Sequence, residues 1–260
     1  MRKGFKMIPK EKLAEYRVLL GQTLPKMTSK PVTEVNPIRQ GVLKENKNQI
    51  LLVPLDTIAA TNIAHKTNPT DKIAILNFAS FQHAGGRYLD GSLAQEEALC
   101  YCTNLYPELS SFQKTWYDPH KKCLHWGAYE NQSLLSHDVT VVAKGIGDLL
   151  SPFDFFHIDV LTCAAPNWTS AVRYKKVPIE DMRKATEERI DYVMSIFSSG
   201  NYDEVIIGAF GCGVFKNDPT FVAKCFISTL NKYQFKHIIC AIPDEKSKNY
   251  KAFKQVLEGE

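Results

Sequence analysis

The sequence lacks a run of about 18 apolar residues, the length that a membrane-spanning helix requires, so no membrane partner is expected. Its basic residues are not clustered, and the net charge of +4 over 260 residues is mild. A dedicated nucleic-acid surface is therefore not expected either. There is no internal repeat, low-complexity tract or break in composition. These absences leave a globular protein, whose 44% hydrophobic content is enough for a sizeable core.

Neither a disulfide framework nor a secretory leader is predicted. The seven cysteines are odd in number, have no CxxC spacing and in several cases sit inside apolar runs, which predicts reduced, buried thiols. The basic N-terminus is not followed by an apolar core, so no secretory signal is expected. These features predict a cytoplasmic protein, with the nucleus left open, and a monomer.

Short apolar runs alternate with amphipathic segments along most of the chain. This order predicts one three-layer α/β/α domain over residues 49–260, with a mixed, mostly parallel central sheet. Residues 1–48 are expected to form an N-terminal extension with a helix over residues 10–24, and residues 118–137 a loop-rich segment. Strands are predicted at residues 50–55, 73–77, 138–143, 157–164, 204–209 and 237–242. Helices are predicted at residues 57–64, 95–105, 110–117, 178–198, 219–233 and 248–257.

Two glycine-containing loops, residues 79–94 and 210–217, follow predicted strand ends. Because parallel strands end at one edge of a sheet, both loops are expected to line the same ligand site. In the second loop, Gly208, Gly211 and Gly213 precede a helix start, a pattern able to turn successive N–H groups toward a phosphate. Tight turns in a sheet protein are the simpler interpretation of each loop alone.

Glu96 and Glu97 open the helix that follows the first loop. Acidic residues in a first helical turn usually complement the helix dipole, and neighbours point about 100° apart, so at most one is expected to face the site. A partly desolvated carboxylate would instead suit a general acid for cleaving a ribose glycosidic bond. Asn77, at a strand end, is equally a turn residue or a partner for ribose hydroxyls.

A zinc site would draw on Cys100, Cys102, His120, Cys123 and His125. The Cys-x-Cys pair would point in different directions on a helix, so buried thiols with loop histidines are preferred, and no metal or cofactor is predicted. Cys212 lies in the second loop, where helix amides are able to acidify it. No histidine partner is evident from the sequence, so Cys212 is not predicted to be a nucleophile.

Several motifs, taken together and in order, resemble those of one family. They are AsnPheAlaSer at 77–80, a glycine-rich loop, GlnGluGlu at 95–97, ThrAsnLeuTyr at 103–106, AlaAlaProAsn at 164–167 and GlyAlaPheGlyCysGlyValPheLysAsnAspPro at 208–219. From residue 50 to residue 257 the chain resembles poly(ADP-ribose) glycohydrolases of the compact microbial type. The resemblance implies a macrodomain-like fold and metal-independent hydrolysis of ribose–ribose bonds in poly(ADP-ribose) or related conjugates on macromolecules, with release of ADP-ribose.

The resemblance also implies roles for single residues. Glu97 would be the catalytic acid/base, and Glu96 and Gln95 would orient the distal ribose and the catalytic group. The substrate would otherwise be bound by Asn77 at the distal ribose, by Gly85 and Gly86 through close approach, by Gly211, Cys212, Gly213, Val214 and Phe215 around the pyrophosphate, and by Asp56 at the adenine.

The first loop departs from the family's usual three glycines, because Ala84 precedes Gly85 and Gly86. This departure leaves chain-length and linkage preference open. It is also the best argument for the alternative from another class, a non-catalytic macrodomain that binds ADP-ribose without cleaving it. A zinc-stabilised nucleotide-binding protein is a third, weaker interpretation.

Overall fold

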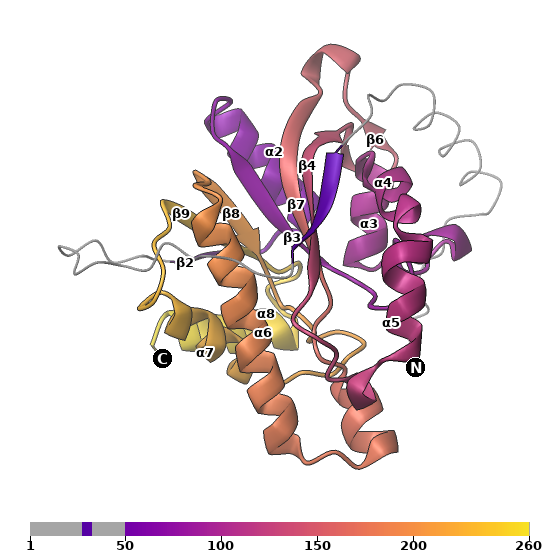
Figure 1. Cartoon of the computed structure of the whole chain (residues 1–260). Helices are drawn as coiled ribbons and strands as arrows, with labels where there is room; N and C mark the ends of the chain where they lie inside the picture. Colours follow the sequence, from indigo (N-terminus) through magenta and orange to yellow (C-terminus); the bar gives the residue numbers. More distant parts are fainter. Residues whose placement is uncertain (1–27, 33–49, 260) are drawn as a thin grey trace.

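A seven-stranded mixed sheet forms the centre of the protein in a computed structural model that describes residues 28–32 and 50–259 (Figure 1). The strand order is β1-β4-β7-β3-β8-β9-β2. Neighbours from β7 to β2 are parallel, whereas β4 is antiparallel to both β7 and β1. The strands are β1 (Thr28–Val32), β2 (Ile50–Val53), β3 (Ile73–Phe78), β4 (Ser133–Val141), β7 (Phe156–Cys163), β8 (Glu204–Ile207) and β9 (His237–Ala241).

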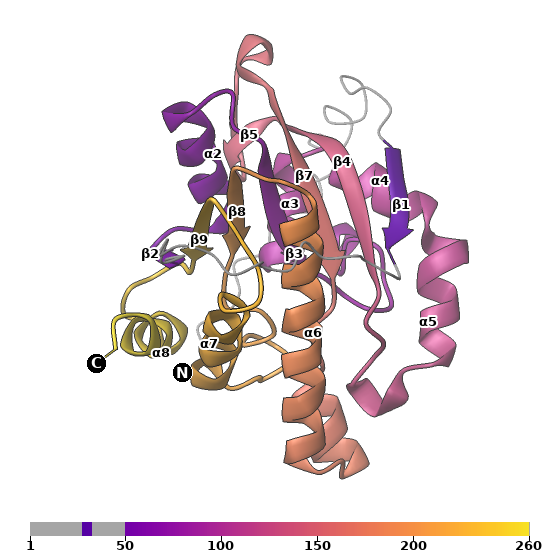
Figure 2. The same ribbon diagram turned by 60° about the vertical axis from the view of Figure 1, so that its left-hand side comes forward.

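Helices cover both faces of this sheet (Figure 2). One face carries α2 (Thr57–Thr67), α3 (Gln95–Cys102) and α4 (Leu105–Ser111), and the other carries α6 (Ile179–Ser199), α7 (Pro219–Thr229) and α8 (Lys248–Leu257). Smaller elements are α5 (Asp118–Lys122), the hairpin β5 (Ala143–Gly145) and β6 (Asp148–Leu149), 3-10 turns η1 (Tyr88–Asp90), η3 (His125–Gly127) and η4 (Pro152–Asp154), and π-helical turns η2 (Gln113–Tyr117) and η5 (Thr169–Tyr174). The predicted three-layer arrangement is confirmed.

Alternation along β3 assigns its residues to the two layers. Ile73 and Ile75 pack in the cluster that contains α2 and α3, whereas Ala74 and Leu76 pack in the cluster that contains α6 and α7. Since side chains on a strand alternate with a period of two, Asn77 falls on the face that α3 covers. The central strand thereby places the side-chain amide of Asn77, near its carboxyl end, beneath the helix that carries the glutamates.

The helix that follows β2 starts where the sequence predicts. Asp56 is the N-cap of α2 and its Oδ1 accepts the Ala59 N–H at 2.8 Å. Caps of this type stabilise a helix by about 1 kcal/mol. Asp218 and Ser247 cap α7 and α8 in the same way. Each cap fixes the start of a helix close to the end of a preceding parallel strand.

Several predicted boundaries are wrong. The segment 118–137 is not mainly loop, because it contains α5 and the first residues of β4, which starts at Ser133. Segment 110–117 is the end of α4 followed by the π-helical turn η2 rather than one helix, and Pro178 is the N-cap of α6 rather than its first residue. Residues 28–32, inside the predicted extension, add β1 to the sheet edge. The predicted helix over residues 10–24 lies outside the described residues.

All seven cysteines are free, as predicted. Six are buried, but Cys123 is exposed, which corrects the expectation of uniformly buried thiols. No helix within residues 28–32 and 50–259 has the length and apolar character needed to cross a membrane.

Candidate active site

A cavity of about 890 Å³ opens at the carboxyl edge of the parallel strands. The segments after all five parallel strands contribute to its wall: Asp56 after β2, Ala79 after β3, Ala165 after β7, residues 209–216 after β8, and Ile242 after β9. Open α/β sheets bind ligands at this edge. The predicted convergence of the two glycine loops, residues 79–94 and 210–217, is confirmed, although only Ala79, Leu93 and Ala94 of the first loop line the cavity.

The two glutamates that open α3 are both buried, with 3% of Glu96 and 5% of Glu97 exposed. Glu96 Oε2 accepts the Ser80 N–H at 2.7 Å, and Glu97 Oε1 accepts the Arg87 N–H, also at 2.7 Å. Both side chains thus turn toward the loop between β3 and α3. The loop folds over the helix start and contacts both carboxylates, but neither glutamate lines the cavity, so the expectation that at most one of them faces it is not contradicted.

Gly86 is the residue on which the two carboxylates converge. A Cβ built on it would lie 2.5 Å from Glu97 Oε1 and 2.8 Å from Glu96 Oε2, and its φ of +59° is one that side chains disfavour. Gly85, with a φ of +65°, similarly leaves no room for a Cβ, which would lie 2.7 Å from the Tyr106 ring. Ala84 has no positive φ and packs, partly buried, on the cluster beneath the loop. The departure from three glycines is thus accommodated without strain.

Burial changes the acidity of this pair. The pKa of Glu96 is raised well above its usual value, chiefly because burial penalises its charge, and the Glu97 charge adds to this. The Ser80 N–H opposes the shift, as does the nearby Asn77 amide. Two carboxylates in one dry site do not both ionise readily. Glu96 therefore keeps its proton at a pH where exposed carboxyl groups have lost theirs.

Three buried acceptor atoms at this site lack a hydrogen-bond partner among the described residues: Glu96 Oε1, Glu97 Oε2 and Asn77 Oδ1. Asn77 is fully buried, and its Nδ2 donates to Thr162 Oγ1 at 3.2 Å, which leaves its oxygen free. Unpaired buried acceptors are costly, so they fit a ligand that supplies several donors. Vicinal sugar hydroxyls have that character.

Gln95 does not offer its amide to the cavity. Its Oε1 accepts the Phe78 N–H at 2.8 Å, and its Nε2 donates to the Leu76 carbonyl at 2.8 Å and to Thr57 Oγ1 at 3.2 Å. The side chain therefore ties the start of α3 to the end of β3. It sets the position of Glu96 and Glu97 relative to Asn77.

The second loop presents backbone donors. The N–H groups of Gly213, Val214 and Phe215 make no hydrogen bond within residues 28–32 and 50–259, and all three residues line the cavity. Three consecutive free amides beside a helix start form a cradle suited to an anion. Val214 is 73% exposed, whereas Phe215 is partly buried with its ring edge-on to Tyr129.

Asn217 holds this second loop in shape, a role that sequence reasoning missed. Its Nδ2 donates to the Pro166 carbonyl at 2.7 Å and to the Gly211 carbonyl at 3.2 Å, and its Oδ1 accepts from Thr186 Oγ1 at 3.0 Å. Gly211 packs against it so closely that a Cβ would lie 2.7 Å from Nδ2. The adjacent AlaAlaProAsn and glycine motifs were the available signal, because both segments meet at this side chain.

The other residues predicted to bind substrate or metal lie in different environments. Asp56 is exposed at the cavity wall while it caps α2, so its position is compatible with the predicted adenine contact. Cys212 lines the cavity, but burial raises the pKa of its thiol far above the usual value. This direction is opposite to that of an activated nucleophile. Of the residues weighed for zinc, Cys100 and Cys102 are buried in the core cluster and are not brought together with Cys123 and His125.

Comparison with known proteins gives consistent results. A family model described as microbial-type PARG, catalytic domain, matches residues 15–144. A poly(ADP-ribose) glycohydrolase from Thermomonospora curvata, solved with the inhibitor ADP-HPD, is 26% identical with a TM-score of 0.71, over 97% of this chain and 85% of that one. One from Deinococcus radiodurans, solved with ADP-ribose, is 25% identical with a TM-score of 0.74, over 99% and 95%. No curated protein matches. The structural likeness confirms the expected macrodomain-like fold.

Proposed function

We propose, from the premise that this chain belongs to the microbial-type PARG catalytic-domain family, that its buried Glu96–Glu97 pair carries out the cleavage. The chain is a glycohydrolase that acts on poly(ADP-ribose). The non-catalytic ADP-ribose reader is therefore set aside. The observation that carries the proposal is the set of three buried acceptors without partners, Glu96 Oε1, Glu97 Oε2 and Asn77 Oδ1.

The distal ribose donates its hydroxyls to Asn77 and Glu96. Donors that reach Glu96 favour its charged form, as the Ser80 N–H already does. Substrate binding thereby stabilises Glu96 as a carboxylate, which leaves the role of proton donor to Glu97. The free Oε2 of Glu97 then protonates the departing glycosidic oxygen, and the resulting carboxylate activates the water that attacks the oxocarbenium-like sugar.

The second loop binds the rest of ADP-ribose. The free amides of Gly213, Val214 and Phe215 take the pyrophosphate, Phe215 packs on the distal ribose, and Asp56 accepts from the adenine amino group. Asn217 and Gly211 keep the loop open to the phosphates. A carrier macromolecule modified with ADP-ribose is the proposed partner, and the protein acts as a monomer in the cytoplasm.

Release of ADP-ribose from a poly(ADP-ribosyl)ated protein tests this assignment. Glu97→Gln keeps the shape of the side chain but cannot transfer a proton, so its rate should fall about 100- to 10,000-fold. Its affinity for ADP-ribose, measured by calorimetry, should be retained. Glu96→Gln should cost less. A lower rate for Glu96→Gln than for Glu97→Gln would make Glu96, rather than Glu97, the acid/base. If the wild-type protein does not bind ADP-ribose, the proposed binding site is wrong.

A further inference from the structure

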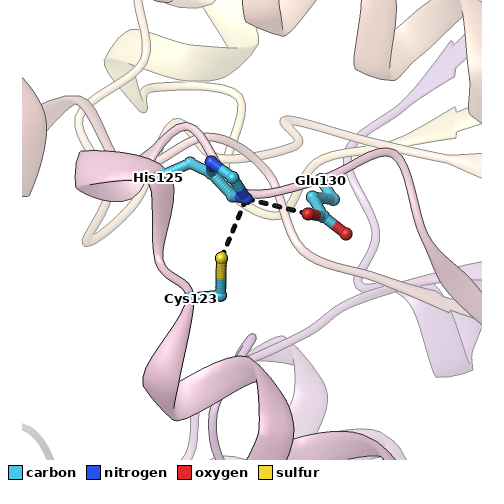
Figure 3. Close-up of side chains that lie close together, drawn as sticks. All are labelled: Cys123, His125 and Glu130. Atoms are coloured by element: carbon cyan, nitrogen blue, oxygen red, sulfur yellow. Dashed lines mark hydrogen bonds and ion pairs between the residues drawn. The ribbon is translucent and has the colours of Figure 1, made fainter.

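Three side chains that bind transition metals converge at the surface just after α5: Cys123, His125 and Glu130 (Figure 3). The His125 Nε2 atom lies 3.1 Å from Cys123 Sγ and 2.8 Å from Glu130 Oε1. All three ligand atoms lie within 4.8 Å of one another. None of these residues belongs to the cavity or to the glutamate pair.

The distances between the three ligand atoms suit a metal ion that would take the place of the hydrogen bonds that join His125 to Cys123 and Glu130. Zinc binds sulfur at about 2.3 Å and imidazole nitrogen at about 2.0 Å, which separates tetrahedral ligand atoms by roughly 3.3–3.7 Å. The observed separations of 2.8 and 3.1 Å are shorter by a few tenths of an ångström to under 1 Å. Small rotations of exposed side chains are enough to admit the ion.

A second layer of residues orients the carboxylate. Gln132 Nε2 donates to Glu130 Oε2 at 2.6 Å, and Gln132 Oε1 lies 2.8 Å from His120 Nε2, which therefore donates to it. The hydrogen bond from Gln132 therefore occupies Oε2 of Glu130, while Oε1 of the same carboxylate contacts His125. Carboxylate ligands of metal ions are held in this way by hydrogen-bonding partners.

We propose that Cys123, His125 and Glu130 bind one zinc ion. A thiolate together with an imidazole selects zinc over magnesium and calcium, which prefer oxygen ligands. Since Cys123 is exposed and the side chains of His125 and Glu130 are each 44% exposed, the fourth position is open to water. This assignment revises the sequence-based expectation of no metal, which had paired Cys123 and His125 with the wrong cysteines.

Zinc at this place would hold a segment that supports the active site. Tyr129, within the same turn, stacks on Phe81 with ring centroids 4.2 Å apart. Phe81 follows Ser80, whose N–H binds Glu96. From the inner side, Arg189 is fully buried and donates to the Ala128 carbonyl at 3.3 Å and to Asn131 Oδ1 at 2.7 Å. The ion would thus stabilise the exposed side of the segment from residue 123 to residue 131, whose buried side Arg189 stabilises through hydrogen bonds.

Metal titration of the full chain under a non-thiol reductant tests the site. After removal of metals by a chelator, wild type should bind one equivalent of Zn²⁺, and Co²⁺ in its place should show the absorption band of a cobalt–thiolate bond. Cys123→Ser should lose that band and bind Zn²⁺ more weakly by at least about 100-fold, and Gln132→Leu by about tenfold. Melting in chelator should be alike for wild type and Cys123→Ser, because Cys123 is exposed.

His237→Ala is the matched control. The exposed side chain of His237 pairs at 3.2 Å with Glu204, whose side chain is only 11% exposed. The pair contains no thiol, so the loss of His237 should leave the zinc affinity within about twofold of wild type. Equal zinc affinities for wild type and Cys123→Ser would overturn the proposal. A cobalt complex of wild type without a thiolate band would do the same.

Discussion

Gly86 in the first glycine loop and Gly213 in the second, both at the carboxyl edge of the sheet, serve opposite purposes. In residues 79–94 the space beside Gly86 is filled by the carboxylates of Glu96 and Glu97. In residues 208–217 a Cβ on Gly213 would meet no atom within 4 Å, and the neighbouring amides are free. One loop excludes a side chain so that protein acids can approach, and the other leaves backbone donors open for a ligand. Substitutions at Gly86 and at Gly213 should therefore have very different effects.

Gly86→Ala should have the largest effect. The added Cβ would displace both carboxylates, and the alanine would have to adopt a positive φ. A misplacement of about 1 Å in an active site lowers kcat/KM by about 100-fold or more. Steady-state release of ADP-ribose measures this loss. Ala84→Gly is the control in the same loop and should stay within about twofold, because Ala84 is unstrained. Similar losses in both variants would contradict the role given to Gly86.

Asn217→Ala should weaken the second loop without touching the acids. The change leaves the Pro166 and Gly211 carbonyls and the Thr186 hydroxyl without this partner, so stability should fall by about 1–3 kcal/mol. ADP-ribose affinity, by calorimetry, should fall about tenfold, since the phosphate cradle loosens. A fall in kcat with unchanged affinity would instead place Asn217 with the first loop.

Glu96→Gln should alter how stability depends on pH. Because burial raises the pKa of Glu96, the folded protein holds a proton that the unfolded chain releases, so wild-type stability falls as pH rises through that raised pKa. The amide does not titrate, so above that raised pKa the variant should be more stable by on the order of 1 kcal/mol, since it buries no charge there. Thermal melts from acid to alkaline pH measure the difference. Parallel curves would show that Glu96 is charged at little cost.

Gly213→Ala should have the smallest effect. The added methyl group meets open space, and the N–H remains available, so KM for substrate should change by about twofold or less. The measurement is the same assay used for Gly86→Ala. A loss as large as that at Gly86 would mean that the ligand, rather than the protein, fills the space beside Gly213.

Local signals made much of the site predictable. Asp56 before a helix, the glycine loop before Glu96 and the glycine cluster before Pro219 are features of neighbouring residues, and the structure places elements there accordingly. The assignment of roles within the glutamate pair came from family resemblance and remains a proposal.

Contacts between distant segments were not predictable. That both carboxylates meet at Gly86 depends on how the loop folds over α3, and a ten-residue separation does not encode this. Asn217 bonds to Pro166 and Thr186, which lie 51 and 31 residues away. β1 was missed because a five-residue edge strand containing Pro31 has almost no periodic signal. Such features arise from tertiary packing rather than from local pattern.

The side chain of Gln95 has a consequence for the timing of catalysis. Its bonds to Leu76 and Phe78 attach the acid-bearing helix to the central strand of the sheet, so the glutamates move with the most protected part of the molecule. The proton donor is therefore preorganised before substrate arrives, and little reorganisation energy remains at the moment of bond cleavage. Any adjustment to polymers of different shape must fall on the loops. Selectivity among substrates can thus change in evolution without disturbing the chemical step.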